Sequence, residues 1–199
     1  MNPAADLSKI NALKRQFLEV AYSHCSGFIV TDGTRKAVSD IFHWCIMVET
    51  PLELHKGLWL WGNIGTGKST MLEIIKDFCK IVRPKQNGWA YSFRINNVID
   101  VCSDFSVGGY GAIKTYIDSN RQAFDEIGSE TIPTGHYGTG ENVMQYILQR
   151  RYDRRFSSFT HATSNISPGD IKQLYGARIY DRCREMFNFV EMRGKSFRH

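Results

Sequence analysis

Hydrophobic residues in the first fifty positions recur at intervals of three and four, the spacing of one face of a helix. The segment 6–25 carries this spacing and precedes Gly27, where a helix can end. A second helix is expected over 34–48, since Pro51 cannot continue it. The apolar positions of the first helix are Leu7, Ile10, Leu13, Phe17, Leu18 and Ala21.

From residue 57 onward, short apolar runs alternate with segments of helical spacing. The predicted strands are 57–61, 89–93, a strand that ends at 125–126, 156–163 and 188–192. The predicted helices are 70–78, 98–104, 113–119, 141–152 and two between 167 and 186, with a glycine-rich loop at 108–111 and a long loop at 128–139. This alternation predicts an α/β fold, a parallel sheet with helices on both faces.

The chain length predicts one α/β core with a short appendage. We expect a helical N-terminal extension over 1–50 and the core over 51–199, within a total of 199 residues. The hydrophobic content of 42% is typical of a soluble globule, and no apolar run is long enough to span a membrane. The first residues lack the pattern of a signal peptide, and the five scattered cysteines lack the spacing of a zinc site. We therefore expect a cytoplasmic protein.

One stretch of the core indicates its ligand. Gly62-Asn63-Ile64-Gly65-Thr66-Gly67-Lys68-Ser69 fills the pattern G-x-x-x-x-G-K-[ST], which cradles the phosphates of a nucleotide. The glycines allow backbone N–H groups to turn toward the phosphates, Lys68 reaches their oxygens, and the Ser69 hydroxyl can coordinate Mg²⁺. We expect nucleotide contacts from Gly62, Asn63, Gly65, Thr66, Gly67, Lys68, Ser69 and Thr70.

The surroundings of this motif argue against a chance match in a glycine-bearing turn. A buried strand is predicted over 57–61, directly before the motif, and Leu72, Ile75 and Phe78 share one helical face directly after it. A phosphate loop requires this strand-loop-helix setting. The sequence therefore predicts ATP as a ligand, with Mg²⁺.

Two adjacent carboxylates supply candidates for the chemistry of hydrolysis. Asp125 and Glu126 lie at the end of a predicted strand, where one carboxylate can hold Mg²⁺ and the other can activate the attacking water. We assign Asp125 to the metal, together with Ser69, and Glu126 to the general base. An ordinary acidic turn is the alternative, and the polar Asn120-Arg121-Gln122 makes the preceding strand weak.

Three further polar residues complete the candidate site. Asn165 follows the next strand and can touch the γ-phosphate there, although Ser167 and Pro168 nearby also suit the start of a helix. Arg178 and Arg182 share a helix face, where their like charges call for an acidic partner. The ATP of a neighbouring subunit would serve.

These motifs together resemble a known family. The phosphate loop, Phe-Asp-Glu-Ile-Gly-x-Glu, Thr-Ser-Asn, Tyr-Gly-x-Arg-x-x-x-Arg and a final Gly-Lys-Ser-Phe-Arg are similar to the AAA+ ATPases of the DnaC/DnaI helicase-loader group and their IstB-like transposon relatives. The similarity covers roughly residues 57–198. It implies that Glu126 drives hydrolysis, that Asn165 is the sensor of the γ-phosphate, and that Arg182 is the arginine finger, with Arg178 as the alternative.

The chain departs from this family in three respects. Many relatives carry Asp-Asp where this chain has Asp125-Glu126, a change that favours hydrolysis. Only about fifty residues precede the phosphate loop, so the domain that grips the helicase is expected to be reduced or absent. No helical lid follows the last predicted strand, and Arg198 is a candidate replacement for a lid arginine.

Several functions fit these features. The leading interpretation is an oligomeric ATPase that loads a replicative helicase, and the helicase rests on the resemblance alone. The alternatives are an IstB-like accessory ATPase of transposition, a small-molecule phosphotransferase, and a nucleotide-gated binding module with little turnover.

The charge distribution bears on DNA as a partner. The net charge is +5, and residues 150–199 carry 11 Lys and Arg against 5 Asp and Glu. This asymmetry suits a phosphate-facing surface, although the run from Arg150 to Arg155 equally suits a solvated helix end. Two glycine-aromatic segments, around Tyr110 with Lys114 and around Tyr137, are candidates for contact with single-stranded DNA without sequence specificity, and flexible solvent loops are the alternative.

Overall fold

The computed structural model describes residues 3–83, 85, 88, 90–194 and 196. The chain divides into two compact units, one of residues 1–52 with 69–92 and one of residues 53–68 with 93–199. The predicted division at residue 50 stays a prediction, because α3, which follows the phosphate loop, groups with the first unit. None of the helices in the described parts of the chain is long and apolar enough to span a membrane.

The first unit consists of three helices. They are α1 (Pro3–His24), α2 (Asp32–Cys45) and α3 (Lys68–Val82), and all three were predicted from helical spacing. Phe17, Phe42 and Phe78 supply one aromatic ring from each helix, with ring centroids 5.1 to 5.9 Å apart. Such pairs of aromatic rings stabilise a core beyond the apolar area that they bury.

Polar contacts fix the ends of these helices. The Thr31 hydroxyl caps α2 by accepting from the Thr34 backbone N–H, while the Thr34 side chain accepts from Thr31 in return. Beyond α3, the Arg83 guanidinium lies over the Trp44 ring at 3.9 Å and donates to the Trp44 carbonyl oxygen at 2.8 Å. This stacking ties the chain after α3 to the end of α2.

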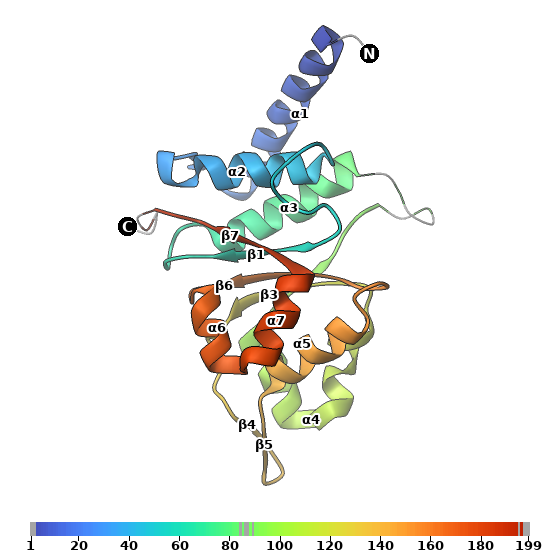
Figure 1. Cartoon of the computed structure of the whole chain (residues 1–199), viewed down its shortest axis with the longest axis vertical. Helices are drawn as coiled ribbons and strands as arrows, with labels where there is room; N and C mark the ends of the chain where they lie inside the picture. The colour runs from blue at the N-terminus through green and yellow to red at the C-terminus, as the bar shows by residue number, and fades with distance from the viewer. Residues whose placement is uncertain (1–2, 84, 86–87, 89, 195, 197–199) are drawn as a thin grey trace. The chain divides into compact units, whose positions relative to one another are not determined.

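The second unit is built on a five-stranded sheet whose paired strands are all parallel (Figure 1). Its strands are β1 (Gly57–Trp61), β2 (Arg94–Asn97), β3 (Arg121–Ile127), β6 (Phe159–Ser164) and β7 (Phe187–Glu191), in the order β2-β3-β6-β1-β7. Its helices are α4 (Val98–Asp118), α5 (Val143–Asp153), α6 (Pro168–Tyr175) and α7 (Ala177–Met186). The α/β class is confirmed.

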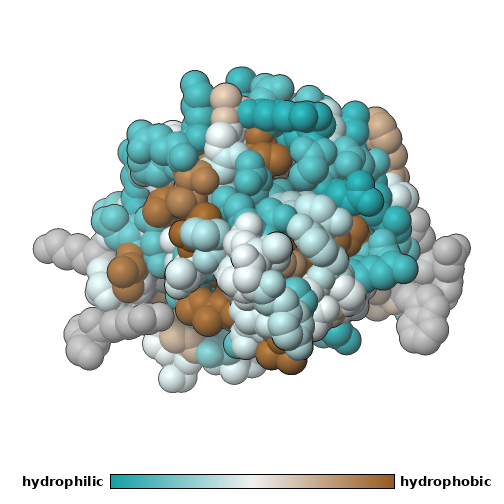
Figure 2. Space-filling model, turned by 90° about the horizontal axis from the view of Figure 1, so that it is seen from below, coloured by the Kyte–Doolittle hydropathy of each residue, from teal (hydrophilic) through white to brown (hydrophobic). Residues whose placement is uncertain are grey.

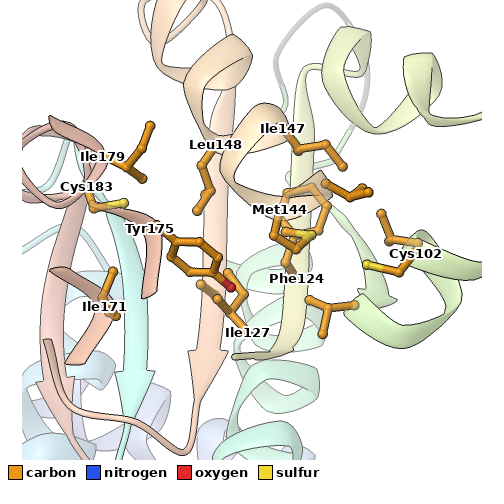
Figure 3. Close-up of a cluster of buried hydrophobic side chains, with 14 of the residues drawn as sticks. Cys102, Phe124, Ile127, Met144, Ile147, Leu148, Ile171, Tyr175, Ile179 and Cys183 are labelled. Carbon is orange, nitrogen blue, oxygen red and sulfur yellow. The ribbon is translucent and has the colours of Figure 1, made fainter. Parts of the chain in front are cut away.

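Helices α4 to α7 lie on the same side of this sheet in Figure 1. Trp59, Phe124 and Ala162 face them from three adjacent strands and join one buried cluster with side chains of all four helices. Figure 3 shows this cluster, in which the Tyr175 ring lies among aliphatic side chains. Leu58 and Ala123, which alternate with them along the strands, are buried as well, so both faces of the sheet are apolar.

The edge strand β2 begins later in the sequence than predicted. A strand was expected at 89–93, but β2 begins only at Arg94, and Trp89 lies outside the described residues. Tyr91 lies under the Arg83 guanidinium at 4.8 Å instead of pairing with β3. The sequence of β2, Arg-Ile-Asn-Asn, is polar because an edge strand is less enclosed than a central one. The apolar run that suggested a strand is used for packing.

The polar residues at the start of β3 have hydrogen-bond partners within the fold. Gln122 is buried, and its side-chain oxygen accepts from the Asn96 side chain at 2.8 Å. The amide of Gln122 also lies 3.4 Å from the Thr115 carbonyl oxygen. Because its polar atoms have partners, the strand forms without an apolar residue at this position.

Two predicted loops contain more regular structure than expected, although the break expected in the glycine-rich segment is present as a kink. The glycine-rich segment is part of α4, which runs from Val98 to Asp118 with one kink at Gly109, where φ is 59° and ψ is −150°. The long loop after β3 contains a hairpin of β4 (Thr134–His136) and β5 (Thr139–Glu141). His136 packs against the kink: a Cβ at Gly109 would lie 2.7 Å from its Nε2 atom, and its Nδ1 atom lies 3.0 Å from the Ser106 carbonyl oxygen.

Arg151 joins three elements inside the second unit. Its side chain is fully buried, and it donates to the Thr160 hydroxyl at 2.7 Å and to the Phe159 carbonyl oxygen at 2.9 Å. It also donates to carbonyl oxygens at the end of α4, namely those of Tyr116, Ile117 and Ser119. Burial lowers the pKa of Arg151 to about 10, so the group stays charged at neutral pH.

We expect Arg151→Ala to lower the free energy of unfolding by roughly 3 kcal/mol or more, since it leaves a cavity and several buried carbonyl groups without a donor. Arg150→Ala is the matched control, because the neighbouring Arg150 is exposed and lies 5.9 Å from the Tyr146 ring. It should change stability by less than about 1 kcal/mol. Urea unfolding curves measure both, and equal midpoints for the two variants would contradict the structural role of Arg151.

Candidate nucleotide site

The phosphate loop connects β1 to α3, and its conformation requires glycine. Gly62, Gly65 and Gly67 have φ values of 140°, 81° and 83°, a region that other residues rarely adopt. A Cβ at Gly62 would lie 2.6 Å from the Met192 carbonyl oxygen, and one at Gly65 would lie 2.1 Å from the Ser196 hydroxyl oxygen. A Cβ at Gly67 would meet nothing within 4 Å, so only the backbone conformation requires glycine there.

The Lys68 side chain folds back onto the phosphate loop and binds its backbone. Its Nζ atom donates to the carbonyl oxygens of Gly62 at 2.8 Å and Asn63 at 2.7 Å, and only 6% of the residue is exposed. The Thr66 hydroxyl donates to the Asn63 oxygen at 2.9 Å. The cation therefore stands at the centre of a curled loop, the position from which it can reach a bound phosphate. Ser69 and Thr70 follow in the first turn of α3.

The sheet brings the other predicted residues to the same edge as this loop. Strand β1 pairs in parallel with β6, and β6 pairs in parallel with β3, so the carboxyl ends of the three strands point the same way. Asp125 and Glu126 lie near the end of β3, and Asn165 comes directly after β6. This edge is where α/β sheets bind ligands.

Thr163 links the two carboxylate positions, and sequence reasoning did not select it. The Thr163 hydroxyl donates to the Asp125 carboxylate at 2.5 Å and accepts from the Glu126 backbone N–H at 2.9 Å. Thr163 is buried, and its two partners are half-buried. The sequence does contain one signal for Thr163: it lies near the end of a predicted strand, two positions before Asn165.

Glu126 has an unusual backbone conformation. Its φ is 66°, and the pairing of β3 with β6 is irregular between Phe124 and Ile127. A bulge of this kind turns a side chain away from the regular strand direction. The Glu126 carboxylate accepts from the Asn97 side-chain amide at 3.2 Å.

Asn97 is a second residue that sequence reasoning missed. It ends β2, and its side-chain oxygen caps α4 by accepting from the Ile99 backbone N–H at 2.9 Å, while its amide group donates to Glu126. An Asn between a strand and a helix is a recognisable capping signal. Its second bond could not be foreseen, because it depends on the pairing of β2 with β3.

Asn165 is exposed just beyond the end of β6. The helix cap considered as an alternative role for this segment is formed by Ser167, whose hydroxyl accepts from the Asp170 backbone N–H, with Pro168 at the start of α6. The capping role is thus filled by Ser167. The assignment of Asn165 to the γ-phosphate stays a prediction.

The two arginines of α7 differ in their surroundings. Arg178 is exposed. The Arg182 guanidinium lies 4.6 Å from the centre of the Tyr152 ring and 4.0 Å from the Asp153 carboxylate, and its side chain is 16% exposed. An acidic partner was expected for these residues, and Arg182 has one in its own chain. Arg178 can reach a neighbouring molecule without breaking such a contact.

A buried pair connects the chain after Glu126 to the segment before Arg178. The Tyr175 hydroxyl donates to the Glu130 carboxylate, which also accepts from the Gly128 backbone N–H at 2.8 Å. Both side chains are buried. Burial, together with the nearby Glu130 carboxylate, raises the pKa of Tyr175 well above its usual value, so the hydroxyl keeps its proton and stays a donor.

The candidate metal ligands are of the type that suits Mg²⁺. The candidate ligands Ser69 and Asp125 offer hard oxygen atoms, and Mg²⁺ takes few protein ligands because phosphates and water fill the rest of its shell. In the described part of the chain, no three His, Cys, Asp or Glu side chains gather into a metal site. A site of one carboxylate and one hydroxyl is consistent with that observation.

Solved structures of replication proteins have the same architecture. The DnaI structure matches with a TM-score of 0.63 and 22% identity, over 90% of this chain and 93% of that one. The structure of the DnaC helicase loader matches with a TM-score of 0.63 and 18% identity, over 85% and 96%. The chain therefore shares the fold of the DnaC and DnaI structures.

A replication initiator has a similar fold. The structure of DnaA bound to AMPPCP and single-stranded DNA matches with a TM-score of 0.56 and 16% identity, over 85% of this chain and 49% of that one. No protein-family model matches the sequence, and no curated protein sequence matches it. The likeness is therefore one of fold, recognised through the arrangement of the strands and loops.

We expect Tyr175→Phe to lower the free energy of unfolding by about 1 to 3 kcal/mol, because the buried Glu130 carboxylate loses a donor. The raised pKa of Tyr175 adds a pH dependence: its stabilising contribution is complete below the unfolded pKa of about 10 and is lost at higher pH. The difference in unfolding free energy between the wild type and Tyr175→Phe should therefore be smaller at pH 10.5 than at pH 7, as measured by urea unfolding. Tyr22→Phe, at an exposed tyrosine, is the control.

Proposed function

We propose that this protein is an Mg²⁺-dependent ATPase that acts in DNA replication as a helicase loader. The observation that carries the proposal is the common edge of β1, β3 and β6, which bears the phosphate loop, the Asp125-Glu126 pair and Asn165. The likeness to DnaC and DnaI over most of each chain supports the loader role.

The chain's residues divide the chemistry among them. Lys68 contacts the β- and γ-phosphates of ATP, and Ser69 with Asp125 holds the metal, which supplies charge neutralisation of the phosphates when bound. Glu126 accepts the proton of the attacking water, and Asn97 keeps its carboxylate in place. Asn165 orients the water against the γ-phosphate. Product release then lets Lys68 return to the carbonyl oxygens of its own loop.

Lys68→Ala should weaken binding of ATP, because the loop loses its positive charge. Glu126→Gln should bind ATP normally and hydrolyse it roughly 10²-fold more slowly, as expected for loss of a general base. Fluorescent-nucleotide titration and phosphate release measure the two effects. Glu19→Gln, on α1, is the control and should match the wild type, whereas unimpaired hydrolysis by Glu126→Gln would exclude Glu126 as the base.

We propose Arg178 as the residue that reaches the ATP of a neighbouring subunit, because it is exposed while Arg182 is packed on Tyr152. Arg178→Ala should bind ATP but hydrolyse it at least tenfold more slowly. Mixing it with Lys68→Ala should restore activity, since some interfaces then join an intact Lys68 to an intact Arg178.

The same experiment with Arg182→Ala identifies the finger. Rescue on mixing with Arg182→Ala, and none with Arg178→Ala, would transfer the role to Arg182. Activity that is independent of protein concentration, without rescue by either variant, would contradict an oligomeric ATPase and favour a phosphotransferase.

DNA contact is proposed for the surface where the kink of α4 meets the β4–β5 hairpin. Tyr137 is 92% exposed at the hairpin, whereas the Tyr110 hydroxyl is bound by the Glu141 carboxylate and its ring packs on Phe105 and Tyr146. Tyr137 is therefore the better candidate for stacking on a base. Figure 2, viewed from this end of the molecule, shows hydrophobic patches separated by polar surface.

The basic run at the end of α5 contributes little to such a surface. Arg151 is buried, Arg154 lies 3.5 Å from the Asp118 carboxylate, and Arg155 stacks on Tyr152 and Phe156 and lies 3.7 Å from the Glu185 carboxylate. Arg150 alone of these four is exposed. Three of the four arginines in this run are therefore engaged in contacts within the fold.

Binding to single-stranded DNA should increase with AMPPCP and decrease with added salt, since about 0.7 of a counterion is released for each neutralised phosphate. Tyr137→Ala should weaken binding by roughly 1 to 3 kcal/mol for each stacked base, and Tyr110→Phe should leave it unchanged. Fluorescence anisotropy with an oligothymidylate measures both. The DNA proposal fails if the wild type with AMPPCP shows no salt-sensitive binding at micromolar concentration.

The loader role has its own test. With AMPPCP, the protein should form a complex with the hexameric replicative helicase of its own organism, and with ATP it should increase the amount of helicase placed on closed circular single-stranded DNA. An IstB-like accessory ATPase would instead coat duplex DNA and leave the helicase unaffected.

A further inference from the structure

The chain that follows β7 runs along the phosphate loop. Strand β7 pairs with β1 up to Glu191 opposite Trp61, and the Met192 backbone N–H then donates to the Trp61 carbonyl oxygen at 2.8 Å. At the next position of the loop, a Cβ on Gly62 would lie 2.6 Å from the Met192 carbonyl oxygen. The two backbones therefore stay in contact beyond the end of the sheet.

A second contact lies further into the loop. The three nearest atoms to a Cβ built on Gly65 all belong to Ser196: Oγ at 2.1 Å, Cβ at 2.9 Å and Cα at 3.2 Å. Ser196 thus occupies the space in which a side chain at Gly65 would lie. Met192 lies against the first glycine of the loop and Ser196 against the glycine three positions later, and we call these two residues the strap.

We propose that the strap braces the phosphate loop at Gly62 and Gly65, with Ser196 as a positioning residue, and that nucleotide binding depends on it. The second half of this inference rests on the proposed ATPase function. A loop held on one side by the strap keeps its backbone N–H groups in one arrangement, which reduces the ordering required when a phosphate binds.

Nucleotide binding should also change the contact between the loop and the strap. Lys68 binds the carbonyl oxygens of Gly62 and Asn63, and these bonds must yield when Lys68 turns to a phosphate. Gly62 is the residue that touches Met192. A change at Gly62 therefore reaches the strap directly.

The loop contains its own control for this idea. Gly65 and Gly67 have nearly the same φ, 81° and 83°, so alanine strains the backbone similarly at both. A Cβ at Gly65 meets Ser196, whereas a Cβ at Gly67 meets nothing within 4 Å. Only the Gly65 variant should respond to a change at Ser196.

The experiment is a double-mutant cycle with two readouts, urea unfolding and titration with AMPPCP. Gly65→Ala should lower the unfolding midpoint and weaken AMPPCP binding by about tenfold or more, and adding Ser196→Gly should recover the part of both losses that exceeds the losses of Gly67→Ala. Gly67→Ala should show losses that Ser196→Gly does not recover. In the wild type, AMPPCP should slow hydrogen exchange of the peptide that contains 192–196, with no such effect in Lys68→Ala.

Two outcomes would overturn the proposal. The brace is absent if Ser196→Gly fails to recover the unfolding midpoint of Gly65→Ala, or recovers Gly67→Ala equally. Nucleotide binding does not depend on the strap if Ser196→Gly recovers the unfolding midpoint of Gly65→Ala but not its affinity for AMPPCP. If the wild type binds no AMPPCP at all, the proposed ATPase function fails, and the unfolding cycle still decides whether the strap braces the loop.

Discussion

The parallel pairing of β1 with β6 and of β6 with β3 is the constraint on which the rest of the molecule depends. It sends three strand ends to one edge of the sheet, although the paired residues Trp59 and Ala162 are 103 positions apart in sequence and Phe124 and Ala162 are 38 apart. The phosphate loop, the acidic pair and Asn165 are neighbours only because these strands share a direction. A change of strand order would separate them without altering any single motif.

Neutral polar side chains hold this edge in place. Thr163 binds both the Asp125 carboxylate and the Glu126 backbone, and Asn97 binds the Glu126 carboxylate while it caps α4. Each of them connects two strands at the point where a carboxylate must be positioned. The Glu130–Tyr175 pair extends the same principle toward α7. Buried hydrogen bonds of this kind fix the geometry because any unpaired member costs desolvation energy.

The same hydrogen-bonding requirement explains why three of the four arginines at the end of α5 are engaged within the fold. Arg151 takes the place of several missing donors at the end of α4, and Arg154 and Arg155 pair with carboxylates and aromatic rings. A count of charges treats these side chains as equivalent. Their burial and partners distinguish a structural arginine from one that is available to a ligand, as Arg178 is.

The sequence by itself determined the strand-loop-helix around Lys68, the α/β class and most helices, because local spacing, glycine and capping residues act over short distances. It misplaced β2, expected a loop where α4 has only a kink at Gly109, and missed the β4–β5 hairpin, since edge pairing and a kink packed by His136 depend on distant residues. Only the tertiary structure decided that Thr163 and Asn97 hold the acidic pair and that Ser196 lies against Gly65. These contacts join positions separated by at least 29 residues, and no local pattern encodes them.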